Sequence, residues 1–144
     1  MSRASWPTAP ENPLATLVPG EVQAGNAPDS YVWMARLLDV RGALSARGYN
    51  QAVTASVDLK VRDPLFPQNE GGLRLEVREG AGRALESGRA RARIDVGAFS
   101  GIFTGLLSAS EAARLGRLED ATASEVAALD AIFSGRKPWL MDTF

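Results

Sequence analysis

The sequence predicts an α+β fold in which an about five-stranded, mainly antiparallel sheet is covered by helices. Three observations lead to this prediction. Apolar and polar residues alternate from Val53 to Arg62 and again from Leu73 to Val77, with the period of two that half-buried strands require. Glycines and prolines between these runs mark turns. Beyond Phe99 the apolar residues recur every three or four positions, which is typical of helices lying on a sheet.

Five segments have the composition of strands. They are residues 31–39, 53–62, 73–77, 83–86 and 90–96. The first is apolar apart from Arg36 until it ends at Asp39, as expected of a strand covered on both faces. The Glu79–Gly82 stretch predicts a hairpin turn between the third and fourth strands. In the last strand, alternation directs one set of side chains inward: Ala90, Ala92, Ile94 and Val96.

A short helix is predicted directly before the alternating strands. Asp39 can cap its N-terminus, and Gly48 is a candidate left-handed stop. The apolar face of this helix consists of Val40, Ala43 and Leu44. The chain therefore is expected to turn from the first strand into a helix before the sheet continues.

The remainder of the chain predicts three more helices. The first has an apolar stripe wide enough to lie on a sheet, formed by Phe99, Ile102, Phe103 and Leu106. Ser108 with Glu111, and Thr122 with Glu125, form capping boxes that open the other two. The glycines expected to end these two helices are Gly116 and Gly135. The last helix is expected to bury Val126, Leu129, Ile132 and Phe133.

The composition narrows the classes of function. Sixteen Lys and Arg nearly balance seventeen Asp and Glu, which argues against nucleic acid or an anionic membrane as a partner. The chain has no His and no Cys, so it lacks the commonest general base, thiolates and the usual metal ligands. Catalysis would have to use carboxylates, a lysine, Tyr31, Tyr49 or a chain terminus. No stretch resembles a membrane span or a signal peptide, so we expect a cytoplasmic protein without a metal site.

Two patterns allow a functional and a structural interpretation. A group of arginines could form a basic stripe on the open face of the sheet; they are Arg74, Arg78, Arg83, Arg89, Arg91 and Arg93. Alternation would place these side chains in water anyway, with glutamates between them, and we favour this interpretation. The apolar stripe from Phe99 to Leu107 could line a lipid cavity, but packing of a helix on the sheet is the better prediction.

The two ends of the chain differ in character. Residues 1–30 are rich in proline and glycine and are interpreted as a leader or linker, whereas residues 31–144 are expected to form the domain. The last nine residues, 136–144, are unexpectedly apolar, with Trp139, Leu140, Met141 and Phe144. Spacing alone favours a tail that folds back on its own domain. In the alternative, the tail enters a neighbouring pocket, where burial of its α-carboxylate would raise the pKa and create a proton acceptor.

The order of these segments resembles the C-terminal domain of the enhanced intracellular survival family of N-acetyltransferases. That family has an R-L-x-D-x segment followed by a short helix with an A-L-x-x-R-x-Y pattern. The matching residues here are Arg36, Leu37, Asp39, Ala43, Leu44, Arg47 and Tyr49. The resemblance extends over residues 12–144 and rests on the order of several weak motifs, ending with KPWLMDTF.

The resemblance implies a sterol-carrier-like α+β domain that follows an N-terminal tandem GNAT region, with residues 1–30 as a remnant of the junction. The intact protein would use acetyl-CoA to acetylate an amine substrate. The terminal carboxylate of Phe144 would be its general base, and a tyrosine of the GNAT region its general acid. Family members commonly form hexamers, which implies a homo-oligomer.

This chain does not contain the Q/R-x-x-G-x-G/A loop with which GNAT enzymes bind the pyrophosphate of acetyl-CoA. The nearest string, Gln23–Ala27, is one residue short and precedes an extended segment, so we interpret it as chance. No cofactor-binding residue is therefore expected within the chain, and the isolated chain is expected to be inactive. The alternative function is a free-standing sterol or lipid carrier with the same fold.

Overall fold

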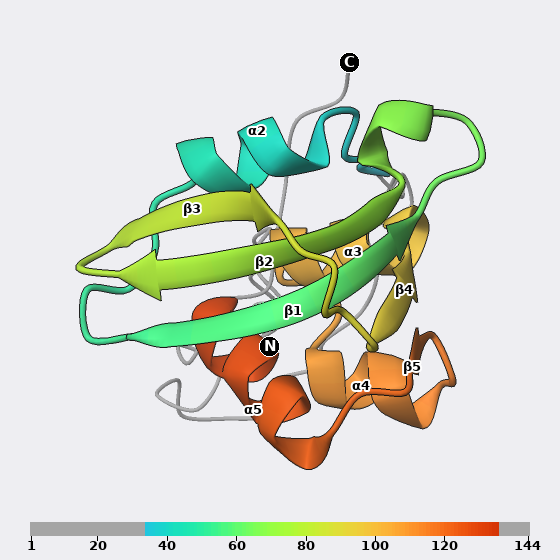
Figure 1. Cartoon of the computed structure of the whole chain (residues 1–144). Coiled ribbons are helices and arrows are strands. Elements are labelled where there is room, and N and C mark those ends of the chain that lie inside the picture. Colours follow the sequence, from blue (N-terminus) through green and yellow to red (C-terminus); the bar gives the residue numbers. More distant parts are fainter. Residues whose placement is uncertain (1–33, 136–144) are drawn as a thin grey trace, which may run out of the picture. The chain divides into compact units, whose positions relative to one another are not determined.

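The computed structural model describes residues 34–135. Apart from Met34, these residues belong to one compact unit, Ala35–Pro138. Within this unit a five-stranded sheet carries helices on one face, while its other face is open (Figure 1). The α+β fold class predicted from the sequence is confirmed.

The strand order in the sheet is β3-β2-β1-β4-β5. The bounds are Ala55–Arg62 for β1, Gly71–Arg78 for β2, Ala81–Glu86 for β3, Arg93–Asp95 for β4 and Leu118–Glu119 for β5. Strand β2 pairs antiparallel with both β1 and β3, and β5 pairs antiparallel with β4. Only the pairing of β1 with β4 is parallel in the described sheet. The predicted mainly antiparallel character is therefore confirmed.

The predicted strand at residues 31–39 is wrong over its described part, because residues 34–39 contain no strand. Their apolar side chains are not covered on both faces, since Met34 is 93% exposed and Leu38 59% exposed. Side chains, rather than a neighbouring strand, hold this backbone: the Leu37 amide donates to Ser100 Oγ at 3.0 Å. The fifth strand is instead β5, which is too short to show an alternating pattern.

The last predicted strand, 90–96, shortens to β4 because the chain turns into a helix at Val96. Ala92, Ile94 and Val96 are buried as expected, whereas Ala90 is only half-buried. The predicted hairpin is confirmed between β2 and β3. Glu79 and Gly80 both have positive φ, 54° and 78°, which is the requirement of a two-residue turn that follows the strand twist.

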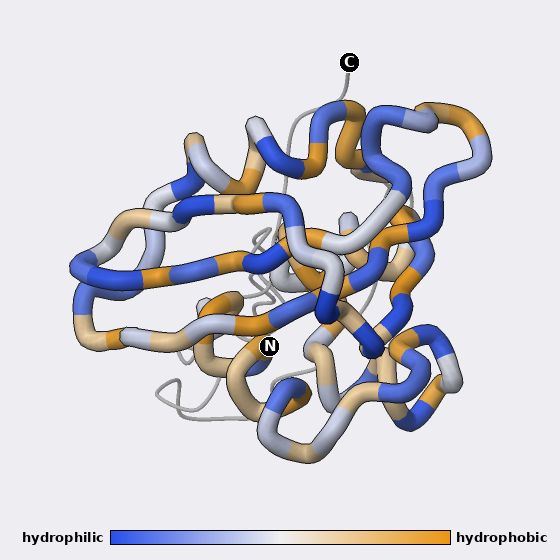
Figure 2. Tube along the Cα trace, in the orientation of Figure 1, coloured by the Kyte–Doolittle hydropathy of each residue, from blue (hydrophilic) through white to orange (hydrophobic). Residues whose placement is uncertain are grey.

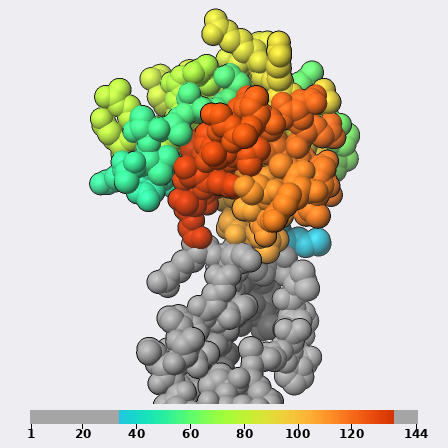
Figure 3. Space-filling view, turned by 90° about the horizontal axis from the view of Figure 1, so that it is seen from below, coloured from blue at the N-terminus to red at the C-terminus, as the bar shows by residue number. Residues whose placement is uncertain are grey.

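Four α-helices are described: α2 at Val40–Ala46, α3 at Val96–Thr104, α4 at Ala109–Arg114 and α5 at Ala123–Ile132. A short 3₁₀ helix, η1, spans Pro67–Asn69. Asp39 caps α2, and both predicted capping boxes, at Ser108 and Thr122, are confirmed. Figure 3 shows α5 in red beside α4 in orange, and Asp130 of α5 accepts a hydrogen bond from the Ala109 amide that opens α4.

Two predicted helix ends are wrong. Gly48 is not among the residues with positive φ. Helix α2 ends at Ala46, and its C-cap Arg47 has a ψ of 141°, which turns the chain into an extended conformation. Helix α5 ends at Ile132, before Gly135, with Phe133 as its C-cap. Gly116, by contrast, follows α4 with a φ of 66°, as the sequence predicts. A left-handed glycine that the pattern did not single out, Gly105, ends α3.

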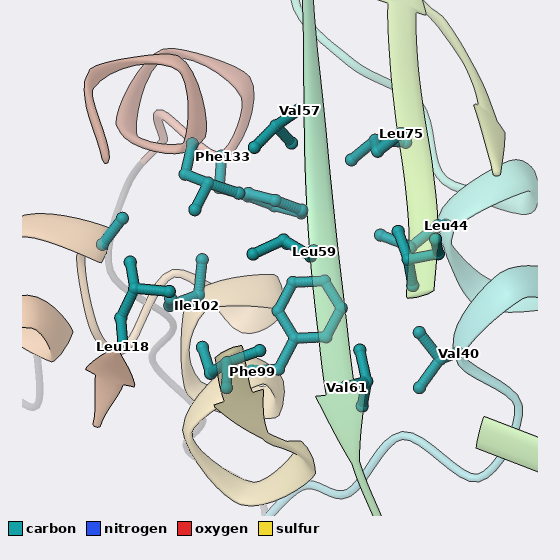
Figure 4. Close-up of a cluster of buried hydrophobic side chains, with 14 of the residues drawn as sticks. Val40, Leu44, Val57, Leu59, Val61, Leu75, Phe99, Ile102, Leu118 and Phe133 are labelled. Carbon is teal, nitrogen blue, oxygen red and sulfur yellow. The ribbon is translucent and has the colours of Figure 1, made fainter. Parts of the chain in front are cut away.

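The core lies between the helices and the inner face of the sheet. Figure 2 shows the alternation of polar and apolar residues along the strands, and Figure 4 shows the inward set meeting side chains of the helices. Fully buried members include Leu44 of α2, Leu59 and Leu75 of the sheet, Phe99 and Ile102 of α3, and Leu129 of α5. The last helix buries Leu129, Ile132 and Phe133 as predicted, whereas Val126 is only partly buried. None of the helices described is long and apolar enough to cross a membrane.

Candidate functional site

The one predicted catalytic group, the carboxylate of Phe144, lies outside the described residues, as do the tail at 136–144 and the string Gln23–Ala27. The structure does describe the residues from which the tail continues. Helix α5 ends at Ile132, and Phe133, Ser134 and Gly135 follow. The candidate site is therefore built from what holds this end of α5.

Phe133 is the centre of an aromatic cluster. Its side chain is only 6% exposed. Its ring meets that of Phe99 edge-on, at 6.0 Å between centroids and an interplanar angle of 86°, and lies 6.2 Å from Tyr49 and 6.4 Å from Phe103. Edge-on arrangements are favoured because the positive edge of one ring meets the negative face of the other. Figure 4 shows Phe133 beside the β1 side chains and above Phe99.

Arg47 joins this cluster as its only cation among the described residues. Its guanidinium carbon lies 5.0 Å from the ring centroid of Phe103, 5.1 Å from that of Phe133 and 5.7 Å from that of Tyr49. One of its terminal nitrogens also donates a hydrogen bond to the carbonyl oxygen of Phe103. That carbonyl belongs to the last turn of α3, where carbonyl groups have no partner within the helix.

Tyr49 is held in place by its hydroxyl and by its ring. The hydroxyl donates to the carbonyl oxygen of Leu44 at 2.7 Å. The ring packs on Gly82 of β3, where a Cβ would come within 2.4 Å of the tyrosine ring, so only glycine fits there. Burial raises the pKa of Tyr49 above its ordinary value, and the Arg47 charge opposes this only in part. Tyr49 therefore remains a neutral phenol and serves as a structural member of the cluster.

A second buried polar group fixes the segment before α2. Asp63 is completely buried at the end of β1 and accepts hydrogen bonds from Asn69 Nδ2 and from the backbone amides of Leu65 and Phe66. It also forms an ion pair with Arg36. Burial by itself would raise the pKa of Asp63, but these hydrogen bonds and the Arg36 charge outweigh it, so the pKa lies below its ordinary value.

Asn69 links Asp63 to the start of α2. Its side-chain oxygen accepts from the Val40 amide at 2.9 Å, and its nitrogen donates to the carbonyl oxygen of Leu38 at 3.2 Å as well as to Asp63. The sequence pattern presents Asp63 and Asn69 only as turn residues. The available signal was an aspartate immediately after a strand with alternating apolar residues, a place where backbone amides need an acceptor.

The predicted basic stripe is broken up by carboxylates, as the structural interpretation expected. Arg74 pairs with Asp58 and Glu76, and Arg93 pairs with Glu119 and Asp120. An open hollow of about 670 Å³ lies near β4, and its lining residues are Lys60, Ala90, Arg91, Arg93, Asp120, Ala121 and Thr122. No group of residues within 34–135 has the composition of a metal site. This face therefore presents a mixed-charge surface in which no single ligand chemistry dominates.

Two residues of the predicted apolar stripe, Phe99 and Ile102, belong to the core, and Phe103 is partly buried against it. Phe99 is completely buried, Ile102 is 1% exposed, and both contribute to the same cluster as the sheet residues (Figure 4). A smaller hollow of about 280 Å³ is open to the surface and is lined by Leu107, Glu111, Arg114 and Leu115. Helix-on-sheet packing, the interpretation that the sequence favours, accounts for Phe99 and Ile102. The prediction is wrong for Leu106, which lies beyond the end of α3 and is 59% exposed, because Gly105 ends the helix.

The fold and these contacts define an α+β domain in which helix α5 ends in an anchored aromatic cluster. The chain belongs to the sterol carrier protein domain family, whose model matches residues 40–141. It is 32% identical over 139 residues to an uncharacterized N-acetyltransferase of Streptomyces griseus, covering 94% of this chain and 32% of that protein.

Solved structures of acetyltransferases contain a similar domain. A GCN5-related N-acetyltransferase from Kribbella flavida aligns with a TM-score of 0.80 and 28% identity, over 95% of this chain and 35% of that one. Eis1 from Mycobacterium abscessus aligns with a TM-score of 0.63 and 29% identity, over 76% of this chain and 27% of that one. The resemblance to acetyltransferases of the enhanced intracellular survival type is therefore confirmed. The chain spans about a third of the length of the curated relative that it matches.

Proposed function

We propose that the chain serves as the C-terminal domain of an acetyl-CoA-dependent N-acetyltransferase. The observation that carries this proposal is the match of nearly the whole chain to about a third of an N-acetyltransferase, together with a shared sterol-carrier-like fold. In this role the domain works with an N-terminal GNAT region that binds acetyl-CoA. The proposal includes a cytoplasmic location and assembly as a homo-oligomer.

The proposed catalytic group of this domain is the terminal carboxylate of Phe144. It takes a proton from the ammonium group of the amine substrate, and the freed lone pair forms a bond to the acetyl carbonyl carbon. The carbon–sulfur bond then breaks, and coenzyme A leaves as a thiol once a tyrosine of the GNAT region has supplied a proton. The bound nitrogen loses its second proton to the tyrosinate, and the Phe144 carboxylic acid returns its proton to water, so the products are an acetylated amine, coenzyme A and one proton.

Within this chain, which has neither His nor Cys, the candidate bases are carboxylates, a lysine, a tyrosine and the chain terminus. Burial of a carboxylate in an apolar pocket raises its pKa toward the range in which it accepts protons effectively. The anchored Phe133 supports the proposal as well, because nine residues, 136–144, separate Gly135 from the end of the sequence. Fully extended, nine residues reach about 30 Å, which is far enough to enter a neighbouring pocket.

The experiment joins this chain to its GNAT region and adds one or two residues after Phe144. We expect kcat to fall at least about a hundredfold, because the carboxylate is displaced, while the affinity for acetyl-CoA stays unchanged. The matched control replaces Thr143 by serine and keeps the chain length. Unchanged turnover in the extended protein would remove Phe144 as the base.

A second measurement tests whether the acetyl-CoA site belongs to the GNAT region rather than to this chain. Calorimetric titration of the 144-residue chain alone with acetyl-CoA is expected to give no heat of binding, because the chain contains no phosphate-binding loop. Tight binding would contradict the assignment of the cofactor site to the GNAT region.

A further inference from the structure

The end of α5 is held by a cation that has no carboxylate partner in the part of the chain described. None of the ion pairs formed within residues 34–135 includes Arg47. A half-buried guanidinium without a carboxylate needs other groups to compensate its lost hydration. The structure supplies them as three aromatic faces and one helix-terminal carbonyl.

These groups come from the C-terminal ends of three helices. Arg47 is the C-cap of α2, Phe103 lies in the last turn of α3, and Phe133 is the C-cap of α5. The C-terminal end of a helix carries a partial negative charge and unpaired carbonyl groups, so a cation is favoured there. Arg47 therefore joins three helix ends that are far apart in the sequence.

The last of these ends is the point from which the tail continues. The Phe133 amide donates to the Leu129 carbonyl at 2.9 Å, and the Ser134 amide donates to that of Ala131 at 3.4 Å. These are the final backbone hydrogen bonds described before residue 136. The Ser134 hydroxyl also donates to the Ala131 carbonyl at 2.9 Å, and together with the packing of the Phe133 ring these contacts fix the direction in which the chain leaves α5.

We propose that Arg47 is a positioning residue for the proposed acetyl transfer: its guanidinium, stacked on Phe103 and Phe133, fixes the end of α5 and so aims the C-terminal tail. This inference rests on the proposed function of Phe144. Residues 136–144 connect Gly135 to Phe144, so fixing the end of α5 restricts the positions from which the carboxylate can reach its target. Arg47 does not touch the reacting atoms and acts through Phe133.

The first test measures amide hydrogen exchange in the 144-residue chain, which reads local opening without any activity. Arg47→Met keeps an unbranched, apolar stem and removes the charged guanidinium. We expect exchange of the amides in residues 131–135 to accelerate about tenfold or more, because cation–π contacts and a charge-assisted hydrogen bond are lost. Exchange in residues 57–61 and 73–77 of β1 and β2 is expected to stay the same.

Arg83→Met is the matched control, because Arg83 is exposed on the open face of the sheet and the structure shows no ion pair for it within residues 34–135. It should change exchange in neither region. Arg47→Lys keeps the charge but loses the planar fork, so it should accelerate exchange at 131–135 by less than Arg47→Met. Should Arg47→Met fail to fold, Arg47→Lys and Phe133→Leu report the same local effect. Unchanged exchange at 131–135, or equal acceleration in β1 and β2, would overturn the proposal.

The second test uses the chain joined to its GNAT region. Arg47→Met is expected to lower kcat about tenfold with the KM for acetyl-CoA unchanged. In protein extended beyond Phe144, where the carboxylate is already displaced, Arg47→Met should cause no further loss. An equal loss in both backgrounds would make Arg47 a general stability residue. If the extension alone leaves kcat unchanged, the proposed base is wrong, while the hydrogen-exchange result still decides whether Arg47 anchors the end of α5.

Discussion

The inner face of β1 and β2 carries apolar side chains, whereas the outer face of the same strands carries a ladder of charges. Val57, Leu59 and Val61 are at most 2% exposed and meet the helices. Between them, Asp58 faces the open side and pairs with Arg74 of β2. One strand therefore takes part in apolar packing on its inner face and in ion pairs on its outer face, because successive side chains point to opposite faces.

Two arginine–aspartate ion pairs also differ in how deeply they are buried. Asp63, paired with Arg36, is completely buried and accepts further hydrogen bonds from Asn69 and two backbone amides. Asp58, paired with Arg74, remains partly in water. Removal of a partner from the buried network leaves groups without hydrogen bonds, whereas water replaces a lost partner on the open face.

The largest loss of stability is expected from a substitution on the inner face of the sheet. Phe99→Ala should lower the free energy of unfolding by about 3–5 kcal/mol, because Phe99 is fully buried and its removal leaves a cavity. Urea denaturation measures this change. Arg83→Ala on the open face provides the control, with a change within about 0.5 kcal/mol. A loss below about 1 kcal/mol for Phe99→Ala would show that the core collapses around the vacancy.

The buried network around Asp63 should make an intermediate contribution to stability, and this contribution should depend on pH. Because the pKa of Asp63 is lower in the folded chain than its ordinary value of 3.8, its stabilisation is present above that value and is lost as the pH falls through the folded pKa. Asp95, which caps α3 and pairs with Arg117, has a lowered pKa for similar reasons and acts in the same direction. Urea denaturation should therefore show lower stability at pH 3 than at pH 6.

Asp63→Asn isolates the share of this pH dependence that belongs to Asp63. The variant should be less stable than the parent at pH 6 and should lose less stability between pH 6 and pH 3. Asp58→Asn is the matched control for the loss of a carboxylate that pairs with an arginine on the open face. Equal slopes for Asp63→Asn and the parent chain would contradict the role given to the Asp63 carboxylate.

The smallest loss of stability is expected from a substitution on the open face of the sheet. Arg74→Met removes contacts to Asp58 at 3.2 Å and to Glu76 at 3.0 Å, both partly exposed to solvent. We expect a loss of about 0.2–1 kcal/mol in low salt, which shrinks in 1 M sodium chloride because the pairs are screened. A larger loss that salt does not reduce would show that this ladder contributes to packing as well as charge.

Regular local patterns allowed much of the fold to be predicted. The alternation of Val57, Leu59 and Val61 predicts β1, and the Ser108 and Thr122 capping boxes predict where α4 and α5 begin. Each of these signals needs only neighbours within a few residues. The prediction of a strand at 31–39 is wrong over its described part because a strand needs a partner strand. In residues 34–39, the Leu37 amide donates to Ser100 and the Leu38 carbonyl accepts from Asn69 instead.

The candidate site could be predicted only in part. The pattern that ends in Arg47 and Tyr49 was visible in the family resemblance, but the sequence carries no sign that Phe103 and Phe133 meet Arg47. These residues lie on three different helices, and their approach depends on how the helices pack on the sheet. Phe144, the proposed base, remains a prediction outside the described residues.

The sequence by itself determined the α+β class, the strand alternation, the N-caps of α2, α4 and α5 and the lack of His and Cys, because each depends on local periodicity or on composition. Only the tertiary structure decided the parallel pairing of β1 with β4, the two-residue strand β5, the burial of Asp63 and the meeting of three helix ends at Arg47. The physical reason is that these features arise between segments distant in the chain, where packing and desolvation outweigh local preference.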